Sequence, residues 1–501
     1  MQVQIVIVDS GRLSETPLQS SLCLNLSFPQ VGVADRRLYQ LTPALDKIAD
    51  VVHIEIRQAV TDRKVFFFWL PLAFSWLLMS FEGLWIQGVI GRKPDSETQL
   101  AAFGLMFSLS VLIETPIIML LATSNALSRD RQSFRVLWRF MMAANFFVFA
   151  LAVLAGFTPL LDVYLGGLLD VPGHIIEATR PGMQVMIFWG AFIGYRRFHQ
   201  GIMIRSGKTR YVGLGTVLRA LVSATVATGL GAITNLAGAV VGACALMLAM
   251  AAETLYTYAV SRPDVKRLLQ TPMPAGKPRL TKGDALRFHL PLAATSLVTL
   301  LSSPVIERGL ASMPDAARSL AAWPVIFTIM LIARSGGMAY QEVVISLNDS
   351  EARHRLLRKF TIRLGLALSL LMALFAFSPA IAFYQAAIIQ APPHLRELVL
   401  LGAQAGIMLP LLTTLQSYLR ALLMLSHKTG AIYQAIIIGF VLTAAAVWGG
   451  IALGFHGILA ASLGLSFGLT VELGYLYLAY RRGQAALRSH WQSSVAPSLG
   501  G

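Results

Sequence analysis

Charged residues are scarce in this chain. Asp, Glu, Lys and Arg make up 13% of its 501 residues, whereas hydrophobic residues make up 55%. A soluble globular domain usually contains about 25% charged residues. Acidic residues are the rarer kind, 25 against 41 Lys and Arg, which leaves a formal net charge of +16. The composition excludes an ordinary soluble protein and predicts an integral membrane protein.

Cysteine is almost absent, and so are the motifs of soluble catalytic sites. The two cysteines, Cys23 and Cys244, lie far apart, which excludes a disulfide framework and a cysteine metal cluster. The sequence has no GxxxxGK(S/T) phosphate-binding loop, no Cys/His metal spacing and no nucleophile elbow. We therefore predict no catalytic residue, no metal site, no cofactor and no enzymatic activity.

Long apolar runs, in contrast, are abundant. A helix crosses a bilayer with roughly 20 mostly apolar residues, and lipid offers the backbone no other way to satisfy its polar groups. Twelve segments of that kind are present, at 65–91, 99–127, 135–159, 181–205, 211–234, 237–260, 285–310, 318–347, 357–385, 399–426, 431–453 and 457–480. The predicted fold class is an all-α integral membrane protein with twelve transmembrane helices.

The short links between these segments alternate in charge. The even-numbered links are basic, as in Arg129, Arg131 and Arg135 after the second segment, whereas Asp162, Asp170 and other acids lie in the odd-numbered ones. Because Lys and Arg gather on the cytoplasmic side, both termini are expected in the cytoplasm, in a bacterial inner (plasma) membrane. This bias explains the positive charge without a nucleic-acid partner.

The sequence repeats itself at one offset. "WLPLA" begins at position 69 and "HLPLA" at position 289, and we call the difference between these positions the repeat offset. The same offset relates "QLAAFGL" to "SLAAWPV" and "SGKTR" to "SHKTG". A fourth pair, "ETLYTYA" and "ELGYLYLA", is separated by one position less than the repeat offset. Six segments separate the copies, so both halves enter the membrane in the same direction. Such parallel repeats occur in transporters that bind a solute between their halves.

We therefore predict two pseudo-symmetric six-helix bundles with a single cleft between them. The predicted divisions are a cytoplasmic N-terminal leader at 1–64, an N-lobe at 65–260, a linker at 261–284, a C-lobe at 285–481 and a cytoplasmic tail at 482–501. The leader lacks an apolar run of spanning length, and we expect it to be either disordered or the product of an overlong start site. No function is assigned to it.

One acid and one base occupy equivalent places in the two halves. Glu114 and Arg334 are related by the repeat offset, and each lies inside an apolar run. Burying either charge alone costs several kcal/mol or more, so we expect the two to pair across the cleft. The pair would line a cavity or gate, or would only fix the packing of the lobes.

Glu82 is an asymmetric acid, because its equivalent in the second half is Ser302. An intramembrane carboxyl suits a group that gains and loses a proton or a cation during transport; alternatively, it only bonds neighbouring helices. Breaks that would let helices bend are expected at Pro116, at Pro304 and at Gly336-Gly337.

Arginines inside apolar runs point to an anionic solute. Arginine pairs with carboxylate and phosphate in a bidentate way, so Arg308, Arg334 and Arg420 of the second half are expected to line the substrate path. In the first half, Arg196, Arg197 and Arg219 are expected to reach lipid headgroups instead. Two acids, each followed by two tyrosines, are expected to anchor an aromatic belt: Glu253 and Glu472.

Four stretches are informative together: the acid followed by "GLWIQGVIG", the "LAAFGL" that opens the second segment, and the helix ends "RRFHQGIMIRSGKTR" and "SYLRALLMLSHKTG". These stretches resemble the multidrug and toxin extrusion (MATE) transporters. The resemblance covers roughly 65–480. It places Glu82 at the family's coupling acid, as Glu where drug exporters usually have Asp. The wider multidrug/oligosaccharidyl-lipid/polysaccharide (MOP) superfamily includes lipid-linked oligosaccharide flippases, and "SSPVIERG" at 302–309 is similar to the progressive ankylosis (ANK-like) branch.

Together these features predict a secondary transporter that exports a small, anionic solute, either organic or phosphate-bearing. Export is expected to be coupled to H⁺ or Na⁺ at Glu82. Glu114 and the three second-half arginines are expected to line the substrate path. We expect a monomer in the bilayer. The alternatives are a flippase for a lipid-linked sugar, with an apolar groove beside a basic cavity, a broad multidrug antiporter, and a non-transporting scaffold or receptor with a dry Glu114–Arg334 pair.

Overall fold

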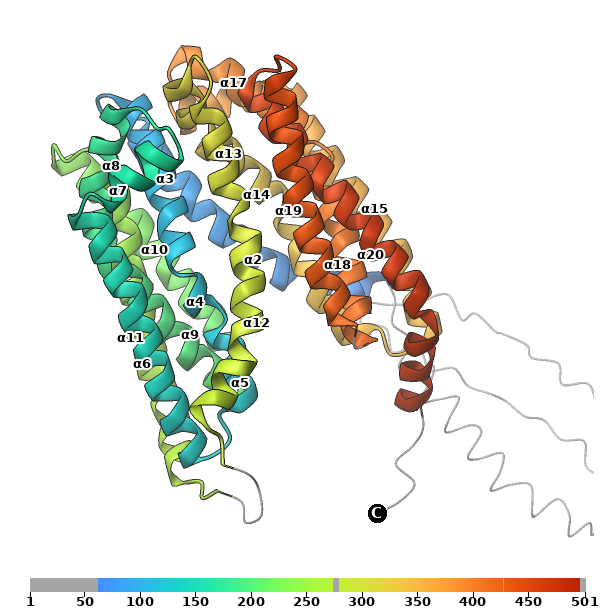
Figure 1. The fold of residues 1–501 in the computed structure, drawn as a ribbon. Coiled ribbons are helices and arrows are strands. Elements are labelled where there is room, and N and C mark those ends of the chain that lie inside the picture. Colours follow the sequence, from blue (N-terminus) through green and yellow to red (C-terminus); the bar gives the residue numbers. More distant parts are fainter. Residues whose placement is uncertain (1–61, 274–278, 427, 496–501) are drawn as a thin grey trace, which may run out of the picture. The chain divides into compact units, whose positions relative to one another are not determined.

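The computed structural model describes residues 62–273, 279–426 and 428–495, which belong to a single unit, and within these ranges it contains helices and no strand (Figure 1). The first half contains α2 (Asp62–Ile90), α3 (Ser96–Ile113), α4 (Thr115–Ile118), α5 (Leu120–Leu127), α6 (Arg131–Phe157), α7 (Leu160–Asp162), η1 (Val163–Leu168), α8 (Gly173–Val185), η2 (Met186–Phe188), α9 (Trp189–Arg205), α10 (Thr209–Ile233) and α11 (Gly238–Gln270). The second half contains α12 (Lys282–Leu300), α13 (Ser302–Ala311), α14 (Ala316–Leu347), α15 (Glu351–Phe377), α16 (Pro379–Phe383), η3 (Tyr384–Ile388), α17 (Pro393–Ala405), α18 (Leu409–Leu425), α19 (Thr429–Ala452) and α20 (Gly457–Val495).

The all-α membrane fold class is confirmed. Each predicted segment lies on a helix or on consecutive short helices. Among the described residues, ten helical spans are long and apolar enough to cross a membrane, or eleven if α17 and α18, which meet at 41°, form one broken span. The remaining predicted segment, 181–205, is helical in α8 and α9 but carries Arg196, Arg197 and His199, so its composition differs from that of a lipid-facing helix.

Several helices start where the sequence supplies a cap. Asp130 and Thr281 each accept a bond from the backbone of the residue three positions on, and that residue's side chain bonds back to the cap. These capping boxes satisfy amide groups that the first helical turn leaves free. Both caps lie in basic links that were predicted to be cytoplasmic, at the first turns of α6 and α12.

The predicted division of the chain stays a prediction, and all four of its boundaries fall inside helices: α2 begins at Asp62 and α12 at Lys282, before the predicted boundaries at 64 and 284. α11 continues to Gln270, past the predicted end of the first half at 260, and α20 continues to Val495, past 481. Charged residues extend both helices beyond their apolar parts, and hydropathy marks only the apolar part. The predicted leader lies outside the described residues except for 62–64, which begin α2, and the predicted linker is described except for 274–278.

The internal repeat extends to unusual backbone geometry. The π-helical turns η1 and η3 end at Leu168 and Ile388, which are related by the repeat offset, and their first residues differ from it by a single position. Each turn is followed by a residue in the left-handed region, Asp170 with φ 59° and Gln390 with φ 52°. Non-glycine residues rarely adopt this conformation. The same deviation at the same offset supports the two-fold repeat independently of the matching motifs.

The predicted helix breaks are found in part. Pro116 lacks an amide hydrogen and its ring clashes with the carbonyl four residues before it; α3 ends at Ile113, and the hydroxyl of Thr115 donates to Leu112 O at 2.6 Å. In the seventh segment the break lies at Leu301, three residues before Pro304.

The predicted break at Gly336-Gly337 is wrong, because α14 is continuous from Ala316 to Leu347. These glycines allow close packing instead. A Cβ atom at Gly336 would lie 2.9 Å from the ring of Trp69, and one at Gly337 would lie 2.6 Å from Thr414 Oγ1. Two neighbouring helices, α2 and α18, therefore approach α14 at a distance that only glycine permits.

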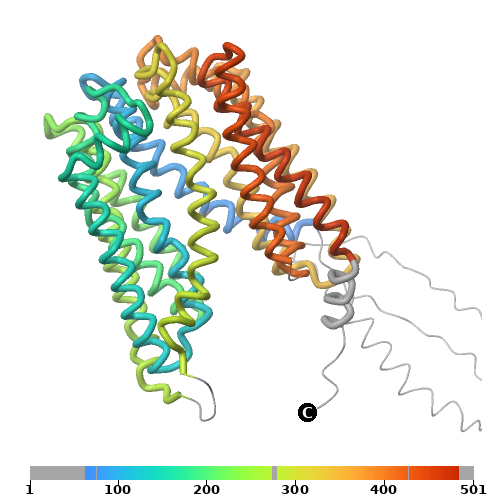
Figure 2. The backbone as a smooth tube through the Cα atoms, in the orientation of Figure 1, coloured from blue at the N-terminus to red at the C-terminus, as the bar shows by residue number. Residues whose placement is uncertain are grey.

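The first helix of each half crosses to the other half. α2 packs against α14 of the second half as well as α10 of its own half. α12 packs against α4, α5 and α6 of the first half, while its continuation α13 packs against α19 and α20 (Figure 2). The two halves are therefore joined by reciprocal crossing helices.

Two hydrogen bonds at the repeat offset hold these crossings. Trp69 Nε1 donates to Gly336 O at 2.8 Å, and His289 Nε2 lies 2.6 Å from Pro116 O. The offset relates Trp69 to His289, and it also relates Pro116 to Gly336. His289 Nδ1 also lies 2.8 Å from Thr123 Oγ1. The repeated sequence thus builds the same contact twice, with tryptophan in one copy and histidine in the other.

Trp69→Phe is expected to destabilise the chain by about 1–2 kcal/mol, because it leaves the buried carbonyl of Gly336 without this donor while retaining an aromatic ring. Trp85→Phe is the matched control, since Trp85 Nε1 donates to Thr228 Oγ1 at an exposed position. Thermal unfolding in detergent measures both. An equal effect of the two substitutions would contradict a special role for the crossing bond.

At one face of the described unit the two halves meet closely. Arg308 Nη1 lies 2.8 Å from Asp170 Oδ2, and His394 Nε2 lies 2.5 Å from Glu97 Oε2. A Cβ atom at Gly91 would lie 1.9 Å from Ile389 O. All these residues lie in or beside odd-numbered links, so we call this the odd-link face. It is closed by side chains and by backbone.

Candidate functional site

A cavity of about 200 Å³ lies among α2, α3, α13 and α14. Its walls are largely apolar and aromatic, with Phe103, Phe107, Trp323 and Phe327 among them. Two carboxyl groups also line it, Glu82 of α2 and Glu307 of α13. The described residues that line this cavity include no lysine, arginine or histidine. It is an acidic and aromatic cavity built from both halves.

The repeat offset also governs the polar residues of this cavity. Gln87 Nε2 donates to Thr328 Oγ1 at 2.8 Å and to Pro324 O at 3.1 Å. At the repeat offset, the equivalents of Gln87 and Thr328 are Glu307 and Ser108, and both of these line the same cavity. These two equivalent positions therefore carry an amide in the first half, Gln87, and an acid in the second half, Glu307.

Glu307 is buried, with 5% of its surface exposed, and among the described residues it has no ion-pair partner. A buried carboxylate without a base has to take up a proton or meet a cation. The sequence interpretation missed this residue, because it weighed only the neighbouring Arg308. The available signal was an acid inside the seventh apolar segment, at the position equivalent to Gln87.

Glu82, the predicted coupling acid, also lines the cavity and is 8% exposed. On its other side is Arg219 of α10, whose Nε atom lies 3.0 Å from Glu82 Oε2. This is a contact of charges without the alignment of a hydrogen bond, and Glu82 Oε1 has no hydrogen-bond partner among the described residues. The carboxylate is therefore only partly satisfied by the protein.

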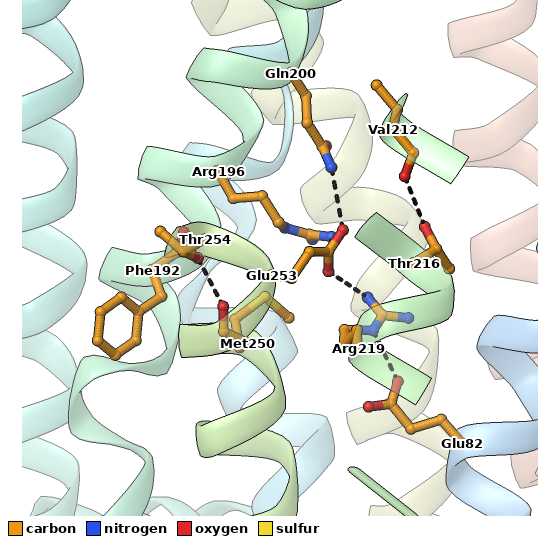
Figure 3. Close-up of polar contacts among 10 residues, drawn as sticks. All are labelled: Glu82, Phe192, Arg196, Gln200, Val212, Thr216, Arg219, Met250, Glu253 and Thr254. Atoms are coloured by element: carbon orange, nitrogen blue, oxygen red, sulfur yellow. Dashed lines mark hydrogen bonds and ion pairs between the residues drawn. The ribbon is translucent and has the colours of Figure 1, made fainter. Parts of the chain in front are cut away.

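Behind this pair lies a buried network of charges in the first half (Figure 3). Glu253 of α11, fully buried, accepts from Arg196 Nη1 at 2.7 Å and from Gln200 Nε2 at 3.2 Å. Arg219 Nη1 lies 3.6 Å from Glu253 Oε2. A chain of alternating charges thus runs from the wall of the cavity at Glu82 into the interior of the first half.

The predictions for Arg196 and Arg219 and for the two tyrosine-flanked acids were wrong. Arg196 and Arg219 are 5% and 6% exposed, so they do not reach lipid headgroups. Glu253 forms an ion pair with Arg196 in the interior, and Glu472 forms one with Arg420. Each arginine lies on a helix face that meets a buried carboxylate, and a sequence does not reveal which face that is.

The predicted pairing of Glu114 with Arg334 is also wrong. Glu114 is buried at the break between α3 and α4, within electrostatic range of Arg196, Arg197 and Arg219. Arg334 Nε donates to Thr413 Oγ1 at 2.7 Å on α18. Each charge interacts with groups of its own half, so neither needs a partner across the two-fold axis.

The other predicted path residues lie away from the cavity. Arg308 is paired with Asp170 at the odd-link face, where both side chains are partly exposed, and Arg420 is paired with Glu472 inside the second half. Of the five residues predicted from the sequence, only Glu82 lines the cavity in this conformation. A place on the substrate path for the other four stays a prediction.

No protein-family model matches the sequence, and no curated protein matches it significantly. Solved structures do match. An inward-facing MATE-family multidrug resistance transporter of the MOP superfamily aligns with TM-score 0.59 and 15% identity, over 84% of this chain and 96% of its own. A MATE protein in complex with MaL6 aligns with TM-score 0.57 and 17% identity, over 86% of this chain and 98% of its own.

A third match is a MOP superfamily transporter from Pyrococcus furiosus, described as having a binding pocket of reverse polarity, with TM-score 0.57 and 14% identity, over 86% of this chain and 97% of its own. The resemblance to the progressive ankylosis branch stays a prediction. At these identities the likeness concerns architecture, and the alignments span nearly the whole length of each match. The chain has the fold of the MATE transporters of the MOP superfamily.

Proposed function

We propose that the chain is a secondary active transporter that exports a small cationic, partly apolar solute in exchange for protons, by alternating access of its two halves. The fold supports the transport mechanism, since its relatives in architecture are transporters. The cavity supports the class of solute. The observation that carries the proposal is that Glu82 and Glu307, one from each half, line a single aromatic cavity.

A cation fits this cavity for two physical reasons. Its charge replaces the protons or counter-ions that buried carboxylates require, and aromatic rings attract cations through their faces. The volume of about 200 Å³ is somewhat larger than an engineered cavity of about 150 Å³ that holds benzene. The solute enclosed in this conformation is therefore small. This proposal agrees with the multidrug-antiporter alternative and narrows it to cations.

The predicted anionic solute has less support from the cavity. That prediction depended on Arg308, Arg334 and Arg420, and none of the three is among the residues that line it. The non-transporting alternative required a dry pair of Glu114 with Arg334, and the two residues interact with different partners. A cation transporter is therefore the better proposal.

We infer the direction of access from the orientation that the charged links predict. The odd-link face is then the outer face, and its close contacts make the described conformation the inward-facing one. We retain the proposals of a monomer in a bacterial inner membrane with both termini in the cytoplasm. Glu82 and Glu307 would both meet the solute, and Glu307 would exchange the coupling proton.

Glu307→Gln is expected to reduce proton-driven transport at least about tenfold, because the amide keeps the shape of the side chain but cannot exchange a proton. The measurement is uptake of tetraethylammonium into proteoliposomes whose interior is acidic. Tetraethylammonium is suitable because it has a fixed charge and carries no proton. Ser303→Ala, a neutral change in the wall of the same cavity, is the control and is expected to retain most of the activity.

The same vesicles test the charge of the solute. Wild-type protein is expected to transport tetraethylammonium faster than benzenesulfonate, an organic anion of moderate size. Faster transport of benzenesulfonate, or an unaltered rate in Glu307→Gln, would contradict the proposed function and return support to the anionic solute.

A flippase for a lipid-linked sugar is the second candidate, because one feature that it predicted is present. An apolar groove of about 500 Å³ is bounded by α2, α14, α15 and η3, with Trp69, Phe74, Leu371 and Phe375 in its walls. An acyl chain would fit such a groove. The basic cavity that this alternative also required is not found at the described central site. Translocation of a fluorescent polyprenyl phosphate across vesicles, at a rate above that of protein-free vesicles, would favour this candidate.

A further inference from the structure

Arg219 is placed between two carboxylates of different surroundings. On one side its Nε atom lies 3.0 Å from Glu82, which faces the cavity; on the other its Nη1 atom lies 3.6 Å from Glu253, which is fully buried. Arg219 itself is buried and is not among the residues that line the cavity. Its guanidinium group therefore separates the cavity wall from the interior network.

Neither contact of Arg219 is optimal. Its Nε atom lacks a well-aligned acceptor and Glu82 Oε1 lacks a donor within the described part of the chain. A guanidinium group normally binds a carboxylate through two parallel hydrogen bonds. A loose contact of this kind leaves Glu82 available to a second cation that enters from the cavity.

The network holds as many carboxyl groups as guanidinium groups. Its three carboxylates are Glu82, Glu114 and Glu253, and its three arginines are Arg196, Arg197 and Arg219. Arg219 Nη1 already lies 3.6 Å from Glu253 Oε2, so Arg219 would still have an ion-pair partner after leaving Glu82. Glu307, in contrast, has no arginine within ion-pair distance among the described residues.

Resting on the proposed function, we propose that Arg219 is a built-in counter-cation: it neutralises Glu82 while the cavity is empty and moves to Glu253 when a cationic solute binds Glu82. The proton that is exchanged for the solute then comes from Glu307. Binding of one monovalent cation separates Glu82 from Arg219, releases one proton from Glu307 and leaves the total charge unchanged.

Proton counting tests this division of roles. Tetraethylammonium is added to purified protein in weakly buffered detergent solution, and bound cation and released protons are measured together. Wild-type protein is expected to release about one proton per bound cation, since binding of a positive charge displaces a proton from a buried acid. Glu82→Gln is expected to bind at least about tenfold more weakly but to release the same number of protons. Glu307→Gln is expected to release almost none.

Changes at Arg219 provide the opposite test. In Arg219→Gln, Glu82 loses its internal cation and has to hold a proton instead, and one bound cation still releases about one proton because its single charge neutralises one carboxylate. Adding Glu307→Gln to that variant is expected to retain about one released proton, now from Glu82, whereas Glu307→Gln alone releases almost none. Arg219→Lys retains the positive charge and should behave as the wild type. If Arg219→Gln does not fold, the number of protons released by Glu82→Gln still tests the proposal.

Two results would overturn the proposal: loss of proton release in Glu82→Gln, or almost no proton release in the folded double variant with Arg219→Gln and Glu307→Gln. Either could occur while the proposed function stands, because the wild type would still bind and transport the cation. Failure of the wild type to bind tetraethylammonium would contradict the proposed function itself, and this inference with it.

Discussion

Glu253→Gln is expected to destabilise the chain by about 3–5 kcal/mol, because removing one member of a buried ion pair leaves the other charge unpaired. Glu253 is fully buried and accepts from Arg196 and Gln200, with Arg219 at 3.6 Å. A neutral amide keeps the size of the side chain but not its charge. We expect a lower melting temperature in detergent and a much smaller yield of folded protein.

The two-fold repeat provides the control, Glu472→Gln. Glu472 is paired with Arg420, whose side chain is 25% exposed, whereas the side chain of Arg196 is 6% exposed. Water can therefore replace part of the lost interaction at Arg420, and a partly exposed ion pair contributes less to stability. The loss should be clearly smaller than for Glu253→Gln. Equal losses would show that burial of the pair does not determine its contribution.

Gly91→Ala is expected to prevent closure of the odd-link face and to reduce transport strongly. The added Cβ atom would lie 1.9 Å from Ile389 O, and a backbone oxygen cannot rotate away as a side chain can. Overpacking of this kind costs about 1–3 kcal/mol, which shifts an equilibrium between two conformations about 5- to 150-fold. The open conformation at that face should become dominant.

Accessibility of the cavity measures this shift. In a version with Cys23 and Cys244 replaced by Ser, a cysteine at Ser303 reports on access from the odd-link face through its reaction with a membrane-impermeant maleimide. Gly91→Ala should accelerate that reaction and lower tetraethylammonium uptake. Gly173→Ala is the control, because a Cβ atom there meets no described atom within 4 Å. Identical reaction rates in the two variants would refute the closed contact at Gly91.

Much of the fold could be predicted from the sequence, because the signals were long or repeated. Apolar runs predicted the helices, and a single offset predicted the two-fold arrangement. The offset also relates the donors Trp69 and His289, and it relates their acceptors Gly336 and Pro116, so the two halves form the same contact. It further places Gln87 and Glu307 at equivalent positions in one cavity.

The partners of the buried charges could not be predicted in the same way. The repeat offset identifies equivalent positions, but it does not show that the residues at those positions are in contact with each other. Glu114 and Arg334 are equivalent and interact with separate groups, whereas Arg219 and Glu82 are not equivalent and lie 3.0 Å apart. Which side of a helix meets which neighbour depends on rotation and crossing angle, and hydropathy does not encode either. Glu307 was missed because the adjacent Arg308 gave a stronger signal for an anion.

The crossing of α2 has a consequence for biosynthesis. The carbonyl group that receives the indole of Trp69 belongs to a residue 267 positions later. At about 5–20 residues per second, a ribosome needs roughly 15–50 s to reach it. During that interval the first part of α2 resides in the bilayer without the helix that will cover it, and lipid must solvate its aromatic residues. Maturation of the first half therefore waits for the second, although the two share one repeated pattern.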